Sequence, residues 1–276
     1  MADNLTDDLR LAHMLADAAD AITMERFRAR DLTVTLKADR TEVSDADKAV
    51  EDMIRARLAT ARPRDGFHGE ETGTSGWGRR RWVIDPIDGT ANYVRGAPVW
   101  ATLIALMVDE VPVVAVVSAP ALNRRWWASQ GDGAYTGKGL LTGRPIHVSD
   151  VATLSESFLS YSSLSGWVQS GRGRQFGDLL RGAERTRAFG DFWSYMLVAE
   201  GCVDIACEPE LNLHDMAALV PIVTEAGGRF TSIDGDAGPV GPGALATNGR
   251  LHAAVLEMLS EDDDTEDSLV IPRRAL

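Results

Sequence analysis

The sequence predicts one compact unit with two sheets: an α+β half with an antiparallel sheet in residues 1–150, and a layered α/β half in residues 151–260. Three observations lead to this prediction. Two helix-like segments open the chain, strand-like segments dominate to about residue 150, and strands and helices alternate afterwards. Hydrophobic residues make up 45% and charged residues 25% of the chain, which is typical of a globular protein.

The two N-terminal helices are predicted from apolar residues at helical spacing. Over residues 5–23 these residues recur at steps of three and four, which indicates an amphipathic helix that ends near Phe27. A second helix is expected over residues 44–61, because Pro63 and Gly66 follow it and do not continue a helix.

The strand-rich part contains a short buried run, residues 82–84, and two expected hairpins. Residues 102–108 and 111–117 flank a two-residue turn as the first hairpin. Residues 125–128 and 133–135 form a second strand pair around a Gly-Asp-Gly sequence. Consecutive hairpins favour an antiparallel sheet in this half.

The second half alternates between the two kinds of element, with no internal repeat and no flexible linker before it. The expected strands are residues 158–161, 186–189 and 203–207, and the expected helices are residues 175–180, 191–200, 214–226 and 251–260. Such alternation is typical of a layered α/β arrangement.

The charge balance limits the classes of partner. Lysine and arginine number 28 against 41 aspartates and glutamates, a net charge of −13, which argues against nucleic-acid binding and a polybasic membrane anchor. Six acidic residues, about half of the excess, lie in residues 261–267, and we expect residues 261–276 to form a flexible acidic tail. The N-terminus is polar, and the sequence has no long apolar run. The two cysteines do not have the spacing of a redox or zinc site. These observations favour a cytoplasmic protein with free thiols.

The most informative segment is residues 82–90, Trp-Val-Ile-Asp-Pro-Ile-Asp-Gly-Thr. A buried strand ends in Asp85, a turn with proline brings Asp88 three residues later, and a helix could begin at Gly89 and Thr90. Paired carboxylates suit a divalent cation, and the N–H groups at a helix N-terminus suit a phosphate. The alternative is an ordinary turn, with both aspartates as cap and surface residues.

Residues 85–90 resemble the first signature of the inositol monophosphatase family of magnesium-dependent, lithium-sensitive phosphatases. Residues 214–228 resemble its second signature, and residues 69–71 and 43–47 lie upstream at the expected spacing, so the resemblance covers residues 5–260. Within this family, four short segments resemble the histidinol-phosphate phosphatases: residues 94–100, 118–122, 124–127 and 190–192. The resemblance implies a layered αβαβα sandwich of the inositol monophosphatase and fructose-1,6-bisphosphatase type, and a homodimer.

The resemblance also implies two to three Mg²⁺ ions in each active site. The implied ligands are Glu70, Asp85 and the backbone carbonyl of Ile87 for a first ion, Asp85, Asp88 and Asp215 for a second, and Glu70 with Asp47 (through water) for a third. His214 stands where the family usually has tryptophan.

In the implied reaction, water activated by the metal ions attacks phosphorus without a covalent phosphoenzyme. Thr90, hydrogen-bonded to Glu70, would orient this water, and Asp88 would hold the water that protonates the leaving alcohol. The backbone N–H groups of Gly89 and Thr90 would bind phosphate oxygens.

Asp191 and Glu208 are the implied contacts of the leaving alcohol, together with Asp88. Carboxylates suit a cationic alcohol, and histidinol carries an ammonium and an imidazole that can be protonated near neutral pH. Residues 190–215 contain no basic cluster for a second phosphate, which argues against a bisphosphate substrate. The resemblance implies a histidinol-phosphate phosphatase of histidine biosynthesis. The alternatives are an inositol-1-monophosphatase or a broad sugar and polyol phosphatase, and, in a different class, a non-catalytic sensor of phosphorylated ligands.

Several of these residues also have a purely structural interpretation. Ser44 and Asp47 have the spacing of a helix capping box, and Asp191 could be the N-cap of the helix that follows it. We expect Phe192 and Trp193 to be core residues rather than ligand contacts. The five histidines have no zinc-site spacing, and we expect them to be exposed or partly buried.

Overall fold

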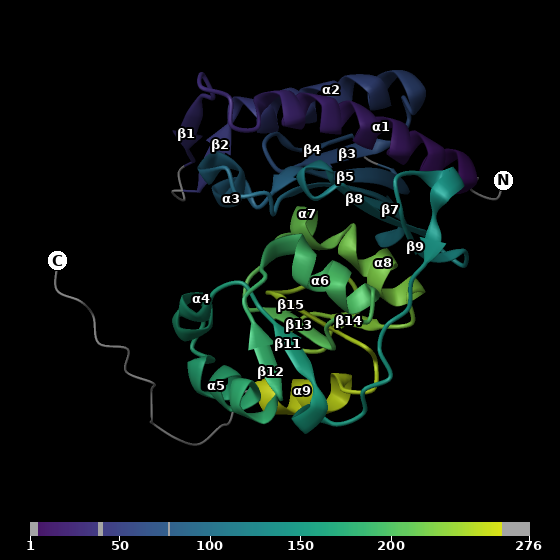
Figure 1. The fold of residues 1–276 in the computed structure, drawn as a ribbon. Coiled ribbons are helices and arrows are strands. Elements are labelled where there is room, and N and C mark those ends of the chain that lie inside the picture. Colours follow the sequence, from purple (N-terminus) through teal and green to yellow (C-terminus); the bar gives the residue numbers. More distant parts are fainter. Residues whose placement is uncertain (1–4, 38–40, 77, 261–276) are drawn as a thin grey trace.

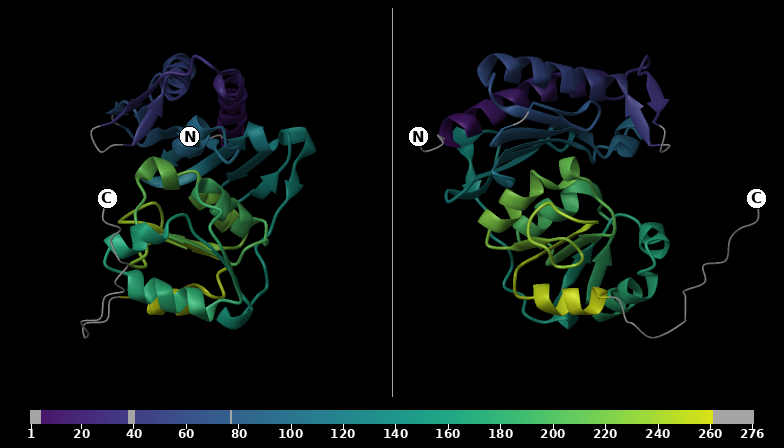
Figure 2. Two further views of the ribbon diagram at one scale, coloured as in Figure 1. Left: turned by 60° about the vertical axis from the view of Figure 1, so that its left-hand side comes forward. Right: turned by 180° about the vertical axis from the view of Figure 1, so that it is seen from behind.

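The computed structural model describes residues 5–37, 41–76 and 78–260, and these form five layers in the order αβαβα (Figure 1). Two further views show the same order of layers (Figure 2). The expected sandwich is therefore confirmed, whereas the expected acidic tail at residues 261–276 lies outside the described residues. None of the helices in the described ranges is long and apolar enough to cross a membrane.

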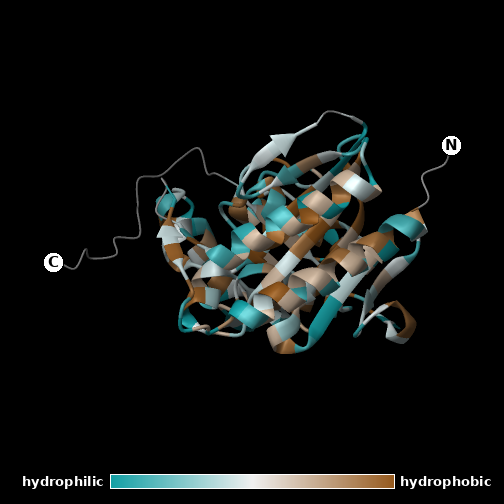
Figure 3. Cartoon of the chain, turned by 90° about the horizontal axis from the view of Figure 1, so that it is seen from above, coloured by the Kyte–Doolittle hydropathy of each residue, from teal (hydrophilic) through white to brown (hydrophobic). Residues whose placement is uncertain are grey.

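The first layer consists of α1 (Leu5–Arg26) and α2 (Asp45–Ala61), whose bounds agree with the prediction within about one residue. Seen from above, these helices carry hydrophilic residues between the hydrophobic ones (Figure 3). The capping box is present: Ser44 Oγ accepts hydrogen bonds from the first turn of α2, and Asp47 Oδ2 accepts one from Ser44 N at 2.8 Å. The buried side of both helices packs on the first sheet.

The first sheet has eight strands in the order β10-β9-β8-β7-β6-β5-β3-β4, and every pair is antiparallel except β3 with β5. Its strands are β3 (Gly66–Gly69), β4 (Gly73–Ser75), β5 (Arg80–Asp88), β6 (Ala101–Val108), β7 (Val111–Ala119), β8 (Arg124–Ser129), β9 (Gly133–Thr136) and β10 (Arg144–Pro145). Both expected hairpins are confirmed. Asp109 and Glu110 have φ values of 49° and 64°, as the two-residue turn of a twisted hairpin requires.

The second sheet has five strands in the order β12-β11-β13-β15-β14. These are β11 (Phe158–Ser160), β12 (Arg185–Arg187), β13 (Ile205–Glu208), β14 (Arg229–Thr231) and β15 (Ala244–Thr247). The pairs β11–β12 and β11–β13 are parallel, and the pairs of β15 are antiparallel. A separate hairpin, β1 (Val34–Leu36) with β2 (Glu42–Ser44), connects α1 to α2.

The remaining helices cover the two sheets. They are α3 (Thr90–Arg95), α4 (Leu164–Gln169), α5 (Gly173–Gly182), α6 (Asp191–Ala199), α7 (Leu213–Met216), α8 (Leu219–Glu225) and α9 (His252–Leu259). The expectation of one helix over residues 214–226 is wrong, because it is divided into α7 and α8. Pro221 has no N–H to bond the carbonyl of Ala217, and it is accommodated in the first turn of α8 instead.

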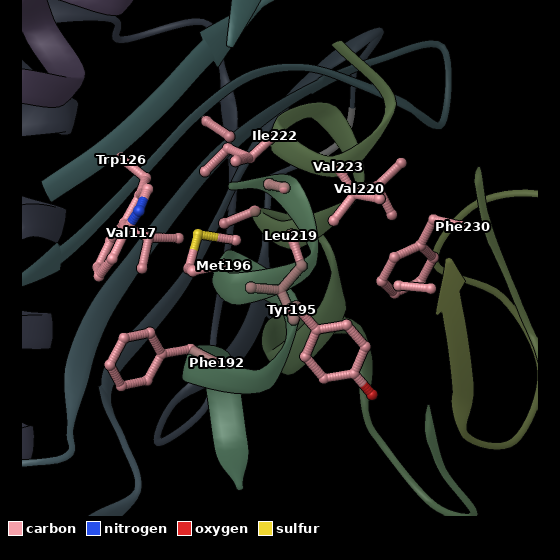
Figure 4. Packing of buried hydrophobic residues seen from close by; sticks show 14 of the residues in the cluster. Val117, Trp126, Phe192, Tyr195, Met196, Leu219, Val220, Ile222, Val223 and Phe230 are labelled. Atoms are coloured by element: carbon pink, nitrogen blue, oxygen red, sulfur yellow. The ribbon is translucent and has the colours of Figure 1, made fainter. Parts of the chain in front are cut away.

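The largest core lies between the two sheets and contains α6 and α8 (Figure 4). Trp126 of β8 meets Phe192 of α6 edge to face, with ring centroids 6.0 Å apart. Phe192 is 1% exposed, as expected for a core residue, and the half-buried Trp193 packs against Phe189 at 5.2 Å. This core fixes the start of α6 next to the end of β5.

Two histidines differ from the expectation of exposed or partly buried side chains. His13 is 6% exposed and lies edge-on to Trp127, and His252 is fully buried between the hydroxyls of Thr231 and Thr247. Burial lowers the pKa of both imidazoles to about 4, so both are neutral near pH 7. They are structural residues of the core.

Candidate active site

A β-bulge brings Asp85 and Asp88 to the same face of the first sheet. In a regular strand, side chains three residues apart point to opposite faces. Here Asp85 lies opposite Leu103 and Asp88 lies opposite Ala101, so three steps along β5 correspond to two steps along β6. Leu103 and Ala101 belong to the core between the two sheets, so both carboxylates point toward that layer.

Helix α7 supplies a third carboxylate. Carboxylate oxygens of Asp85, Asp88 and Asp215 all lie within 4.8 Å of one another, and within the described ranges this is the group of acids and histidines with metal-site spacing. Asp215 closes the capping box of α7, because its Oδ2 accepts a hydrogen bond from Asn212 N at 2.6 Å. Asp215 thus caps α7 and also lies close to the carboxylates of Asp85 and Asp88 on β5.

The electrostatics of these three acids favour the binding of a cation. Burial, followed by the charges of Glu70, Asp88 and Asp215, raises the pKa of Asp85 well above its usual range. Burial and the charges of Asp191 and Asp215 do the same to the pKa of Asp88. Asp85 Oδ1 is buried without a hydrogen-bond partner. A divalent cation bound to these oxygens would reduce the repulsion between the carboxylates and give Asp85 Oδ1 a partner. These residues therefore fit a divalent cation.

Glu70 lies beside this group, in the turn after β3, and is held by a lysine that sequence reasoning missed. Lys37, directly after β1, places its Nζ 2.6 Å from Glu70 Oε1 and 2.7 Å from Glu71 Oε1. A single lysine in a hairpin between two helices carries no motif, so nothing in the sequence marked it. A cation bound at Glu70 would have to share this carboxylate with Lys37 or displace its ammonium.

The turn that carries Glu70 is fixed by a second residue that the sequence did not reveal. Glu51 of α2 is 1% exposed, and its carboxylate accepts hydrogen bonds from the backbone N–H groups of Glu71 at 2.8 Å and Thr72 at 2.9 Å. A Cβ on Gly69 would lie 2.3 Å from the carboxyl carbon of Glu51. Position 69 therefore requires glycine so that Glu51 can reach the turn.

Thr90 has different partners from those expected. Its hydroxyl donates to the backbone carbonyl of Ile87 at 2.8 Å and has Asp47 Oδ1 at 3.3 Å, so the expected hydrogen bond to Glu70 is wrong. The bulge places the Ile87 carbonyl within one turn of Thr90, which makes this local bond available. The structural interpretation of Asp47 is confirmed, because its Oδ2 caps α2, and its Oδ1 accepts the contact from the Thr90 hydroxyl. Burial raises the pKa of Asp47 to about 6.

Asp191 is not the N-cap of α6, so that structural alternative is wrong. Gly190 occupies the cap position without a side-chain bond, and the backbone N–H of Phe192 donates to Asp88 Oδ2 at 2.7 Å. Asp191 Oδ2 accepts a hydrogen bond from Asn92 Nδ2 of α3 at 2.9 Å. Burial and the charge of Asp215 raise the pKa of Asp191 to about 6.

Glu208 ends β13 of the second sheet and is 7% exposed. Burial, with the charge of Asp191 next, raises the pKa of Glu208 to about 8, and its Oε1 has no hydrogen-bond partner. Acidic groups from both sheets therefore influence one another.

The neighbouring Cys207 is buried and Cys202 is exposed, and both are free thiols as expected.

His214 packs against a histidine of the first sheet. Its ring stacks on His68 of β3 with centroids 6.1 Å apart, and its Nε2 lies 3.6 Å from Asp215 Oδ1. The pair thus fills the position next to Asp215 where the family usually has tryptophan.

The sequence profile of the inositol monophosphatase family matches residues 4–263. The chain belongs to the inositol monophosphatase family. A histidinol-phosphatase of Streptomyces coelicolor is 61% identical over 259 residues, which covers 92% of this chain and 97% of that protein. A histidinol-phosphatase of Mycobacterium tuberculosis is 54% identical over 255 residues, covering 92% and 98%. The expected resemblance to the histidinol-phosphate phosphatases of this family is confirmed.

Solved structures of family members share the fold. The inositol monophosphatase of Zymomonas mobilis has a TM-score of 0.81 and 31% identity, covering 93% of this chain and 99% of that one. The IMPase of Thermotoga maritima has a TM-score of 0.82 and 29% identity, covering 92% and 96%. The αβαβα architecture is thus that of this phosphatase family.

Proposed function

We propose that this family member is a Mg²⁺-dependent phosphoric monoester hydrolase that converts L-histidinol phosphate and water to L-histidinol and phosphate, in histidine biosynthesis. The observation that carries this proposal is the 61% identity to the Streptomyces coelicolor histidinol-phosphatase over almost the full length of both chains. The converging carboxylates of Asp85, Asp88 and Asp215 support the same chemistry, because a phosphate ester needs concentrated positive charge for hydrolysis.

We assign a first divalent ion to Glu70, Asp85 and the Ile87 carbonyl, and a second to Asp85, Asp88 and Asp215. A third ion would use Glu70 and, through water, Asp47. Oxygen donors alone favour a hard cation such as Mg²⁺. Two to three such ions would supply positive charge to the phosphoryl oxygens and activate water. The raised pKa values of Asp85 and Asp88 support this assignment, since both carboxylates are costly to ionise without a nearby cation.

The catalytic residues in this proposal orient the attacking water, help to protonate the leaving alcohol and bind the phosphate. The Thr90 hydroxyl, bonded to the Ile87 carbonyl and facing Asp47, can accept and pass on a hydrogen bond from the attacking water. Glu70 provides a carboxylate beside Asp85 for the same water, once Lys37 no longer holds it. Asp88 holds the water that protonates the leaving alcohol. The backbone N–H groups of Gly89 and Thr90 open α3 and bind phosphate oxygens.

The alcohol is selected by charge in this proposal. Asp191 and Glu208 are acidic, and both are largely buried near Asp88 and Asp215, whose charges affect their pKa values. A neutral polyol can donate hydroxyl hydrogen bonds to these carboxylates, but the ammonium of histidinol forms charge-assisted hydrogen bonds with them and also compensates their negative charge. Inositol 1-phosphate is the second candidate substrate, because solved inositol monophosphatases share the fold and about 30% of the sequence.

A phosphate-release assay tests the proposal. The purified full chain is incubated with histidinol phosphate or inositol 1-phosphate at matched concentrations, with Mg²⁺ or with a chelator. We expect release with Mg²⁺ only and a higher kcat/KM for histidinol phosphate. A preference for inositol 1-phosphate would overturn the substrate assignment, and no release with either substrate would favour the non-catalytic sensor.

We further propose a cytoplasmic homodimer. The homodimer is supported by the resemblance to the family, and the cytoplasm by the two free cysteines. Light scattering coupled to size-exclusion chromatography checks the first point, with twice the chain mass of 29.8 kDa as the expected result.

A further inference from the structure

Asn92 of α3 connects the phosphate side of the site to the proposed alcohol side. Its side-chain Nδ2 donates two hydrogen bonds, one to the Val99 carbonyl at 3.0 Å and one to Asp191 Oδ2 at 2.9 Å. Val99 follows in the same segment, but Asp191 lies 99 residues later, at the start of α6. The amide therefore joins two parts of the chain that are far apart in the sequence.

Asp191 has a backbone conformation that requires such support. Its φ is 50°, in the left-handed region, and it follows Gly190 with a φ of 78°. A non-glycine residue keeps such a conformation only where neighbouring groups hold it. The adjacent Phe192 N–H is fixed by Asp88 at 2.7 Å, and the Asp191 carboxylate is fixed by Asn92.

The Asp191 carboxylate lies directly over Gly89. A Cβ at position 89 would be 3.2 Å from Asp191 Oδ2 and 3.0 Å from the Val99 carbonyl. Gly89 thus leaves the space into which Asn92 holds the carboxylate, next to the N–H groups proposed for phosphate. Asp191 Oδ1 makes no hydrogen bond within the described part of the chain, so one edge of a fixed carboxylate remains available.

We propose that Asn92 is a positioning residue for substrate selection: it holds the Asp191 carboxylate over Gly89, so that Oδ1 can bind a cationic group on the alcohol of the phosphate ester. This inference rests on the proposed function and identifies how the same site selects its substrate. A carboxylate fixed in advance binds an ammonium more tightly than a mobile one, because less conformational entropy is lost on binding. A neutral alcohol can donate a hydroxyl hydrogen bond to the carboxylate but lacks the attraction between opposite charges, so it gains less from the positioning.

A double-mutant cycle tests the inference. Asn92→Ala, Asp191→Ala and the double variant are assayed with histidinol phosphate and with inositol 1-phosphate at saturating Mg²⁺. We expect Asn92→Ala to raise KM for histidinol phosphate by about tenfold with kcat almost unchanged, and to raise KM for inositol 1-phosphate much less. In the Asp191→Ala background, removal of Asn92 should have no further effect on KM.

Two further measurements separate positioning from a general structural role. Asn92→Asp keeps the size of the side chain but replaces the donor by a negative charge facing Asp191, so KM for histidinol phosphate should rise more than in Asn92→Ala. Binding of L-histidinol by calorimetry should weaken in the same order. Loss of folding by both Asn92 variants would contradict the inference.

The remaining outcomes distinguish this inference from the proposed function. A parent enzyme that does not hydrolyse histidinol phosphate contradicts the proposed function, and this inference with it, before any variant is measured. With the parent active, equal increases in KM for both substrates contradict the inference alone. So does an Asn92→Ala effect that persists in full without Asp191.

Discussion

Asp88 Oδ2 accepts a hydrogen bond from the backbone N–H of Phe192 at 2.7 Å, across 104 residues of sequence. The last residue of β5 thereby serves as a cap for α6, although Gly190 occupies the cap position of that helix. Because Asp88 is also a proposed metal ligand and Asp191 begins α6, one carboxylate couples the metal site to the residue proposed to contact the alcohol.

The double role of Asp88 can be separated by two substitutions. Asp88→Asn keeps an oxygen that accepts from Phe192 but removes the charge, so we expect stability close to that of the parent and a loss of activity of at least about 100-fold. Asp88→Ala removes the cap as well and should cost an additional ~1 kcal/mol of unfolding free energy. Urea unfolding of the metal-free proteins and phosphate release check both statements. Equal stability of the two variants would refute the capping role.

The buried acids make the stability of the metal-free protein depend on pH. Their folded pKa values are raised, to about 8 for Glu208, so between about pH 4 and the folded value the folded state holds protons that the unfolded chain releases. The contribution of these groups to the free energy of unfolding therefore falls as the pH rises. The neutral buried histidines have lowered pKa values and act in the opposite direction, but only below about pH 6.5.

We therefore expect the urea midpoint of the metal-free protein to decrease from pH 6.5 to pH 8. Glu208→Gln should flatten this slope, because the substituted side chain does not titrate. Saturating Mg²⁺ should raise the midpoint more at pH 8 than at pH 6.5, since ionised carboxylates bind it better. A midpoint that increases with pH over this interval would be incompatible with the raised pKa values.

The local parts of the fold could be predicted from the sequence, and several long-range parts could not. The periodicity of α1 and α2 and the turn between β6 and β7 are encoded within short windows. Strands β14 and β15 were missed because their place in the sheet is set by the pairing of β15 with β13, which no short window of sequence shows. The break between α7 and α8 was missed because the apolar pattern continues through Pro221.

Thr90 does not form the expected hydrogen bond with Glu70, but we still propose that its hydroxyl orients the attacking water. Thr90→Ala removes the hydroxyl that bonds the Ile87 carbonyl, and we expect turnover to fall by about 100-fold with little change in Mg²⁺ affinity. Thr90→Ser keeps the hydroxyl and should retain most of the activity. Steady-state kinetics and calorimetric Mg²⁺ titration check the pair. Parent turnover in Thr90→Ala would remove Thr90 from the mechanism.

Glu51 should affect the site without touching substrate. In Glu51→Gln the new amide NH₂ group faces backbone donors, so we expect a loss of roughly 1–3 kcal/mol of unfolding free energy and weaker Mg²⁺ binding through the turn at Glu70. Glu25→Gln, at an exposed position of α1, is the matched control and should behave as the parent. Indistinguishable Mg²⁺ affinities for the two variants would mean that Glu51 does not position Glu70.

The acids of the site were predictable, whereas their supports were not. Asp85, Asp88 and Asp215 lie in recognisable signatures, and the structure brings them together. Lys37, Glu51 and the bond from Asn92 to Asp191 depend on tertiary contacts between segments 33, 20 and 99 residues apart. No local pattern marks a lysine or a buried glutamate as the partner of such a distant turn.

The central claim is that Asp85, Asp88 and Asp215 gather divalent ions around a phosphate ester. Anomalous diffraction from crystals grown with Mn²⁺, which takes the same oxygen ligands as Mg²⁺, tests it most directly. The account predicts anomalous peaks about 2–2.6 Å from carboxylate oxygens of all three aspartates. Crystals with no peak among these side chains at saturating Mn²⁺ would contradict it.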